Sequence, residues 1–244
     1  MLPRLAHTRP PSPESQLTAE PDVRRCAIVT TAKAPHPVTA QAREFAEAYP
    51  PEDSILHVAR GLAREVGLAP VQPGAGAALR LLAAAGAAKA VVEIGTGTGV
   101  SALWLLRGMR PDGVLTTIDV EAEHQRMARR IFVEAGYAPS RTRIITGRAL
   151  DVLPRLSDGA YDLVFVDGGP EEHEACIAAA LRLLRTGGIL AVNGALAGGR
   201  IADPAARDAD TAALREVLKA LREAEEWVQA LLPVGDGLLA AVKR

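Results

Sequence analysis

The chain has 244 residues, of which 48% are hydrophobic and 23% charged, and its formal net charge is −1. This composition supports a packed core and excludes wholesale disorder. A near-neutral charge argues against a nucleic-acid-binding face, and 3% aromatic residues are too few to stack single-stranded bases.

The chain carries no signal that would send it to a membrane or out of the cell. Eighteen consecutive apolar residues do not occur anywhere, and the first residues lack the apolar centre of a signal peptide. Cys26 and Cys176 lie far apart and fit no metal or redox spacing. We therefore expect a soluble, cytoplasmic protein with reduced thiols.

Residues 1–37 contain seven prolines, which exclude a long helix or a central strand. We expect a flexible N-terminal segment, and the alternative is an arm that orders over the active site or a partner subunit. Residues 25–31 (RCAIVTT) are the only part of this segment with β-strand character.

Residues 38–244 are predicted to form one domain with a helical lead-in. Apolar residues at helical spacing predict a helix that follows an N-cap at Asp53 or Ser54 and stops at Gly67. A second helix is expected to follow Pro73 and to continue to Gly86.

Strands and helices then alternate. Strands are predicted at residues 90–94, 114–119, 143–146, 161–167 and 189–192. Helices are predicted between them at residues 101–109, around 127–135, and around 177–184 with Gly187-Gly188 as the stop. A helix around residues 214–221 and a hairpin turning at residues 233–237 complete the chain. The pattern predicts an α/β fold, with a Rossmann-like, doubly wound, seven-stranded, mostly parallel sheet and an antiparallel C-terminal strand.

In such a sheet the ligand binds at the carboxyl ends of the strands. The first strand ends in Glu93, and a loop with Gly95, Gly97 and Gly99 leads to a helix that starts near Ser101. Glycines allow the backbone to approach a ligand closely. Asp119 ends the second strand, 20 residues beyond Gly99, where a carboxylate can accept both hydroxyls of a ribose. These features indicate an adenosine-type cofactor.

The spacing of the glycines favours S-adenosylmethionine over a dinucleotide. A dinucleotide site has the pattern G-x-G-x-x-G, but Val100 stands at the place of the third glycine. Glu93 would repel a pyrophosphate, whereas it would attract an amine or a sulfonium cation. A phosphate-binding G-x-x-x-x-G-K-[ST] loop is also absent from the sequence.

The segments VVEIGTGTGVSALWLL, TTIDVE, GRALDVLP, YDLVFVD and LRLLRTGGILAV resemble class I O-methyltransferases of the catechol and caffeoyl-CoA type, and in particular a bacterial branch of that family. The resemblance covers roughly residues 50–244. It implies S-adenosylmethionine as cofactor, a small-molecule acceptor, a homodimer, and an N-terminal region that helps to close the site. The residues that it implies for cofactor binding are Val71, Glu93, Gly95, Thr96, Ser101, Asp119, Val120, Ala149 and Gly169. The glycine loop adds Gly97 and Gly99 to the predicted cofactor-binding residues.

The chain departs from the metal-dependent members of that family. They carry an aspartate after the fourth strand, a lysine three residues later, and an Asp-Asn pair after the fifth strand. Here Asp167 is kept, the lysine position is Pro170, and the pair is Asn193-Gly194. Because Mg²⁺ prefers several charged oxygen ligands, we expect no metal. Asp167 and Asn193 are then the candidate catalytic residues, as a base or as groups that orient the acceptor.

Other side chains are weaker candidates. His173, in the first turn of the helix after Asp167, is a possible base, but we expect a solvated helix residue. His124 and His57 are interpreted as exposed side chains, and Trp104 is interpreted as part of the core.

We therefore predict an S-adenosylmethionine-dependent enzyme that methylates the oxygen of a small, phenolic molecule. Two alternatives stay open. One is a cofactor-binding protein that has lost its activity, and the other is a nicotinamide-dependent oxidoreductase. Turnover of a panel of phenols would separate the first alternative from an enzyme.

Overall fold

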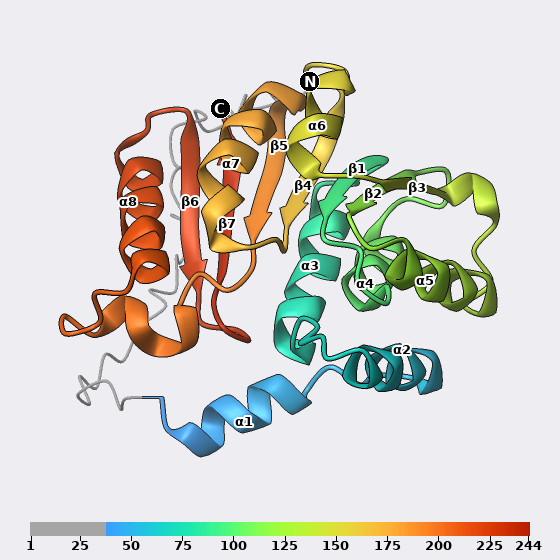
Figure 1. The fold of residues 1–244 in the computed structure, drawn as a ribbon, viewed down its shortest axis with the longest axis horizontal. Helices are drawn as coiled ribbons and strands as arrows, with labels where there is room; N and C mark the ends of the chain where they lie inside the picture. The colour runs from blue at the N-terminus through green and yellow to red at the C-terminus, as the bar shows by residue number, and fades with distance from the viewer. Residues whose placement is uncertain (1–37) are drawn as a thin grey trace, which may run out of the picture. The chain divides into compact units, whose positions relative to one another are not determined.

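The computed structural model describes residues 38–244 (Figure 1). Three helices precede the sheet: α1 (Ala40–Ala48), α2 (Ser54–Glu65) and α3 (Pro73–Ala85). Asp53 is the N-cap of α2, because its side chain accepts a hydrogen bond of 3.0 Å from the backbone N–H of Leu56. Helix α1 was not predicted from the sequence. Its sequence AQAREFAEA has one large apolar side chain, Phe45, so it does not show the apolar stripe that identifies a packed helix, and none of its residues is buried.

The seven strands form one sheet. They are β1 (Ala90–Ile94), β2 (Val114–Asp119), β3 (Thr142–Thr146), β4 (Tyr161–Val166), β5 (Leu184–Val192), β6 (Trp227–Leu232) and β7 (Leu238–Lys243). Their order is β3-β2-β1-β4-β5-β7-β6, and β7 pairs antiparallel with both of its neighbours. The remaining neighbours pair in parallel, so the predicted fold class is confirmed.

Helices cover both faces of the sheet (Figure 1). The helices after the first strand are α4 (Val100–Gly108), α5 (Ala122–Glu134), α6 (Ala149–Val152), α7 (His173–Leu183) and α8 (Ala209–Glu223). Short 3₁₀ turns lie between them: η1 (Pro139–Arg141), η2 (Leu153–Arg155), η3 (Pro170–Glu172) and η4 (Ala197–Ala202).

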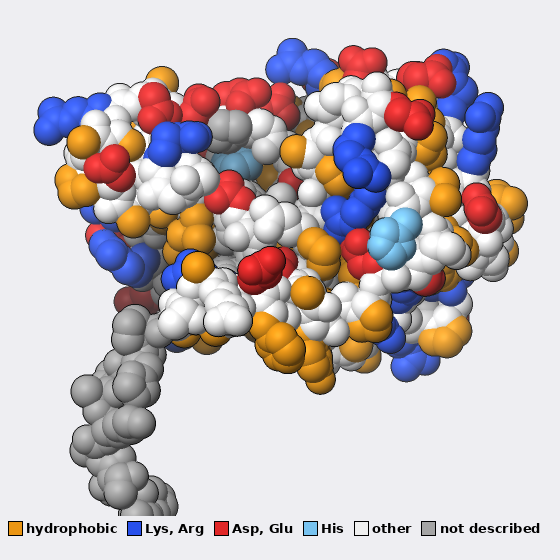
Figure 2. Space-filling view, turned by 90° about the horizontal axis from the view of Figure 1, so that it is seen from below, with side chains coloured by type: hydrophobic (Ala, Val, Ile, Leu, Met, Phe, Trp, Pro, Cys, Tyr) orange, Lys and Arg blue, Asp and Glu red, His pale blue; other side chains and the backbone are white. Residues whose placement is uncertain are grey.

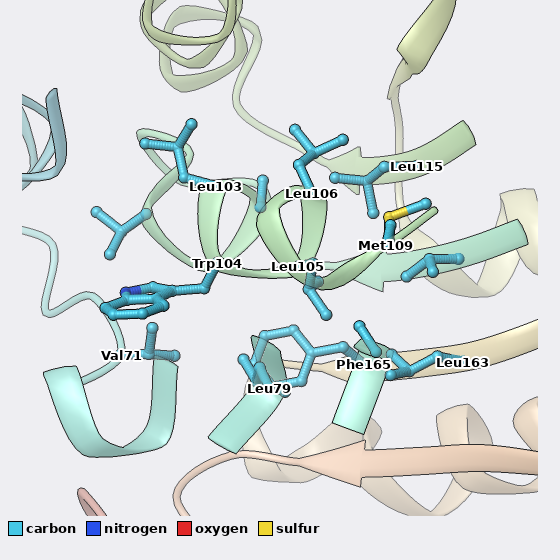
Figure 3. Close-up of a cluster of buried hydrophobic side chains, with 14 of the residues drawn as sticks. Val71, Leu79, Leu103, Trp104, Leu105, Leu106, Met109, Leu115, Leu163 and Phe165 are labelled. Carbon is cyan, nitrogen blue, oxygen red and sulfur yellow. The ribbon is translucent and has the colours of Figure 1, made fainter. Parts of the chain in front are cut away.

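Each face of the sheet has its own hydrophobic core. Helices α2, α3, α4 and α5 pack on one face, while α6, α7 and α8 pack on the other. Alternate strand residues serve the two cores, as Val91 and Val92 on β1 illustrate. Figure 3 shows the first core, in which Trp104 of α4 lies close to Val71, which precedes α3. Trp104 is only 2% exposed, which confirms its interpretation as a core residue.

The predicted helix stop at Gly187-Gly188 was wrong. Helix α7 ends at Leu183, and both glycines lie inside β5. The pairing of β4 with β5 shifts register between Tyr161 and Leu163, and Gly187 adopts a φ of 77° at this irregularity. The glycines therefore accommodate a bulge in the strand.

None of the helices in residues 38–244 is both long enough and apolar enough to cross a membrane. The predictions for residues 1–37, including Cys26 and the strand-like residues 25–31, lie outside the described part of the chain.

Candidate functional site

A cavity of about 510 Å³ lies where β1, β2 and β4 end. Its wall is formed by the glycine loop after β1, by residues that follow β2, β3 and β4, and by the segment before α3. Figure 2 views the molecule from the side on which β4 and β5 end, and both acidic and basic side chains are spread over this face. The position agrees with the rule that ligands of open parallel sheets bind at the carboxyl ends of the strands.

Gly95 brings the ends of β1 and β4 together. Its φ is +96°, and a Cβ at this position would lie 2.7 Å from the backbone oxygen of Asp167. Any other residue would be strained and would push the two strand ends apart. The absence of a side chain at Gly95 therefore places Asp167 directly beside the loop.

The glycine loop continues into the N-terminus of α4, and Gly99 is the N-cap with a left-handed backbone. A Cβ at Gly99 would lie 2.8 Å from the ring of Phe132 on α5, so this glycine allows close helix packing. Val100 and Ser101, in the first turn of α4, line the cavity. The free N–H groups at a helix N-terminus favour a carboxylate or another anionic group of a ligand.

Asp119 is held in a fixed orientation at the end of β2. One carboxylate oxygen accepts a hydrogen bond of 2.9 Å from the backbone N–H of Gly97. The other accepts one of 2.9 Å from the N–H of Glu121. The carboxylate lines the cavity and keeps further lone pairs for a ligand hydroxyl.

Glu93 lies beneath the glycine loop and is fully buried. Its two carboxylate oxygens accept hydrogen bonds of 2.6 Å from the hydroxyls of Ser101 and Thr117. Burial raises its pKa to about 8, and these two hydrogen bonds oppose that rise. Glu93 does not line the cavity, so it can act there through its neighbours rather than by contact.

The hydroxyl network extends from Glu93 to β3. Thr96 and Thr117 exchange a hydrogen bond of 2.7 Å between their hydroxyls. Gln125 of α5 donates to the backbone oxygen of Ile145 at 2.7 Å and accepts from the Thr146 hydroxyl at 2.6 Å. Sequence reasoning missed Gln125, because a glutamine inside an amphipathic helix gives no motif.

Asp167 follows β4 and lines the cavity opposite the glycine loop. Asn193, which follows β5, donates a hydrogen bond of 2.8 Å from its amide nitrogen to Oδ1 of Asp167. Burial raises the pKa of Asp167 to about 6, and the hydrogen bond from Asn193 counteracts this shift. The two predicted catalytic residues are thus in contact, but only Asp167 lines the cavity.

The structure brings most of the predicted cofactor residues to one cavity. The predicted residues that line it are Val71, Gly95, Thr96, Gly97, Ser101, Asp119, Val120, Ala149 and Gly169. Glu93 and Gly99 lie behind this wall and do not line it. The segment 68–70 and the residues Arg148, Glu171 and Glu172 also line the cavity and were not predicted, because they belong to loops without a recognisable motif.

His173 differs from its prediction as a solvated residue. It is only 4% exposed, and its Nε2 lies 3.1 Å from the backbone oxygen of Gly168. Burial lowers its pKa, which favours the neutral ring. The first turn of α7 packs against the sheet. Helical periodicity in the sequence does not predict that this turn is buried. His57 is exposed as expected, and His124 lies at the cavity wall.

Residues 38–244 contain no group of three or more His, Cys, Asp or Glu side chains that could hold a metal ion. Beside Asp167, the side chain of Asn193 presents its N–H donor rather than an oxygen. Gly194 adds no side-chain donor. The residues present therefore do not fit the divalent-metal site of the resembled enzymes.

Comparison with known proteins identifies the family. The family model described as O-methyltransferase matches residues 58–244. The curated protein named "Probable O-methyltransferase Rv1220c", from Mycobacterium tuberculosis, is 55% identical over 192 residues, which cover 79% of this chain and 86% of the relative.

Solved structures agree with this match. A protein from Corynebacterium glutamicum is 38% identical with a TM-score of 0.77, and the alignment covers 83% of this chain and 95% of that one. The O-methyltransferase TomG from Streptomyces achromogenes, solved with S-adenosylmethionine, is 32% identical with a TM-score of 0.74, over 82% of this chain and 94% of that one. An O-methyltransferase from Bacillus cereus, solved with S-adenosylhomocysteine, is 26% identical with a TM-score of 0.74, over 84% and 98% of the two chains. The resemblance seen in the sequence is confirmed, and the chain belongs to the O-methyltransferase family.

Proposed function

We propose that this enzyme transfers the methyl group of S-adenosylmethionine to the hydroxyl of a small phenolic acceptor and needs no divalent metal. The observation that carries the proposal is the position of Asp167. Its carboxylate lines the cavity beside the glycine loop, and its pKa is raised to about 6. A base therefore faces the space where a methyl donor would be bound.

The donor half of the cavity fits S-adenosylmethionine. The carboxylate of Asp119, fixed by two backbone N–H groups, would accept hydrogen bonds from the ribose hydroxyls. Val120 and Ala149 would lie against the adenine, and Gly95 leaves room for the backbone to approach the ligand. When bound, the cofactor supplies a methyl group that its sulfonium has already activated.

In the acceptor half, Asp167 would accept the hydroxyl proton of the acceptor. A carboxyl with a pKa near 6 is ionised at neutral pH and is a stronger base than an ordinary aspartate. Asn193 holds the carboxylate in place through its 2.8 Å hydrogen bond, so we assign it a positioning role. The remaining task is to align the two reactants and exclude water.

The ligands that the chain offers support the proposal that no metal is needed. A Mg²⁺ site needs several oxygen donors in near-octahedral geometry, and charged donors offset the loss of bound water. Asp167 is the one carboxylate of this set that remains, because Asn193 and Gly194 occupy the positions of the Asp-Asn pair. Proton removal would therefore rest on Asp167 itself.

The proposal is tested by incubating the enzyme with radiolabelled S-adenosylmethionine and a panel of phenols and catechols, with and without EDTA. We expect turnover of at least one phenol that EDTA does not abolish. Asp167→Asn should lower kcat by about 100-fold or more and leave the affinity for the cofactor unchanged. Cofactor binding without turnover of any phenol would instead support the inactive alternative.

The nicotinamide alternative finds no support, since the matched family consists of O-methyltransferases. Titration with NADH should accordingly give no saturable binding.

We further propose a homodimer in the cytoplasm. Helix α1 contacts α3 but buries none of its own residues, and Phe45 and Tyr49 are 71% and 76% exposed. Such side chains are typical of a helix that packs against another subunit. Sedimentation of the purified protein should give twice the chain mass, and cell fractionation should recover it with cytoplasmic enzymes.

A further inference from the structure

Glu93 is a buried carboxyl without a cationic partner. Its exposed fraction is 0%, and both of its oxygens accept from neutral hydroxyls, those of Ser101 and Thr117. None of the ion pairs found among residues 38–244 includes Glu93. An isolated charge in such a place is costly, and a buried carboxyl avoids the cost by keeping its proton.

The charged groups near Glu93 strengthen this effect, whereas the two neighbouring hydroxyls oppose it. Helix α4 contributes the hydroxyl of Ser101, and β2 contributes the hydroxyl of Thr117 and, at its end, the carboxylate of Asp119. The end of β4 contributes Asp167. Both aspartates act on Glu93 through their charge, and with burial they raise its pKa, which reaches about 8.

Glu93 is connected to the cavity through short contacts. Ser101, which donates to Glu93, lines the cavity itself. Thr117, the other donor, shares a hydrogen bond with Thr96, which also lines the cavity. Glu93 therefore lies directly behind Ser101 at the cavity wall, and Thr117 connects it to a second wall residue, Thr96.

We propose that Glu93 is a charge-responsive positioning residue: it is protonated in the empty enzyme and releases its proton when the cationic cofactor binds. The inference rests on the use of S-adenosylmethionine that is proposed above. The cofactor carries a sulfonium and an ammonium group against one carboxylate, so its net charge is positive. That charge supplies the counter-ion that Glu93, Asp119 and Asp167 lack.

Binding of the cofactor is coupled to the loss of one proton from Glu93. The neutral carboxyl of Glu93 and the cationic cofactor become a bound pair of carboxylate and cation, and one proton passes to the solvent. Methyl transfer turns the sulfonium into a neutral thioether, so the product S-adenosylhomocysteine offers less stabilisation to the carboxylate. Glu93 should then take up a proton again, and the enzyme should bind the product less tightly than the methyl donor.

The test is isothermal titration calorimetry at pH 7 in buffers with different ionisation enthalpies. The dependence of the binding heat on the buffer gives the number of protons released. We expect the wild type to release up to about one proton for each S-adenosylmethionine bound, and clearly fewer for S-adenosylhomocysteine. Glu93→Gln keeps the shape of the side chain but cannot ionise; its amide oxygen still accepts from one hydroxyl and its amide N–H donates to the other, as the O–H of a protonated carboxyl does, so the variant should abolish this difference. The same variant should lower the preference for S-adenosylmethionine over S-adenosylhomocysteine about tenfold.

Glu134→Gln, at an exposed position of α5, serves as the matched control and should behave like the wild type. Equal proton release by the wild type and Glu93→Gln would overturn the inference while the proposed cofactor stands. A wild type that does not bind S-adenosylmethionine at all would overturn the proposed function itself.

A second measurement needs no variant. The affinity ratio of S-adenosylmethionine to S-adenosylhomocysteine in the wild type should rise between pH 6 and pH 7, because less free energy is then needed to ionise Glu93 when the cation binds. The sulfonium lowers the pKa of the amino group in S-adenosylmethionine, so the comparison is kept to this range, where both ligands carry a charged ammonium. A ratio that does not change over this range would overturn the proposal.

Discussion

The side-chain amide of Asn193 donates a hydrogen bond of 2.8 Å to Oδ1 of Asp167, so the ends of β5 and β4 share one polar contact at the cavity. This contact stabilises the ionised carboxylate and pulls the pKa of Asp167 down against the effect of burial.

The fall in rate on the acid side of the pH–rate profile should reflect the protonation of Asp167. Only the ionised carboxylate can accept a proton, so kcat should fall as the pH drops through about 6. Asn193→Leu removes the hydrogen bond that lowers this pKa, and the limb should move to higher pH. Initial rates between pH 5 and pH 9 measure both profiles, and an unmoved limb in the variant would speak against Asp167 as the base.

Asp119→Ala should weaken binding of S-adenosylmethionine about 100-fold or more, since two charge-assisted hydrogen bonds contribute roughly 1.5–3 kcal/mol each. Calorimetry on the folded variant measures the change. Asp112→Ala is the matched control, because Asp112 forms an ion pair with Lys89. Near-native affinity in Asp119→Ala would remove the ribose assignment.

Gly95→Ala should destabilise the fold and displace the base. The new Cβ would lie 2.7 Å from the backbone oxygen of Asp167 in a left-handed backbone, and such strain costs about 1–3 kcal/mol. Gly61→Ala, in α2, meets no atom within 4 Å and should stabilise the protein by about 0.5–1 kcal/mol. Urea unfolding of the two variants should therefore give shifts of opposite sign.

Glu93 should make the fold less stable as the pH rises. Its pKa is about 8 in the folded protein against the ordinary value of 4.5, so the folded state holds the proton more tightly. The stabilisation of the fold by this tighter proton binding is fully present below pH 4.5 and is lost as the pH rises through about 8. Glu93→Gln should consequently gain stability relative to the wild type from pH 5 to pH 9, measured by urea unfolding at each pH. A difference that is constant over this range would contradict an ionisable Glu93 in the folded protein.

Deletion of residues 1–36 should leave the melting temperature nearly unchanged, because the prolines and the lack of apolar periodicity predict little core in this segment. Thr39, whose side chain caps α1, is retained in this variant. Differential scanning calorimetry gives the comparison. A fall of many degrees would show that the segment packs against the domain.

The sequence predicted the sheet and the cavity because both depend on short-range patterns. Apolar strands between amphipathic helices determine the order of elements, and Gly95 and Asp119 mark strand ends that a parallel sheet brings together. The direction of a side chain was harder to predict. Glu93 and Asn193 were assigned to the ligand, yet Glu93 points at two hydroxyls and Asn193 at Asp167. These contacts join residues from different strands and helices, so no single sequence window contains them.

The close approach of Gly95 to Asp167 has a consequence for how the substrate range of this enzyme can change over evolution. Because the donor loop and the base touch at one point, neither can be altered without disturbing the other. New acceptors would have to be accommodated by residues farther from this contact, in the connection that contains Glu171 and Glu172 and in the segment 68–70. Sequence variation between relatives with different acceptors should therefore concentrate in these two segments, while the strand ends stay constant.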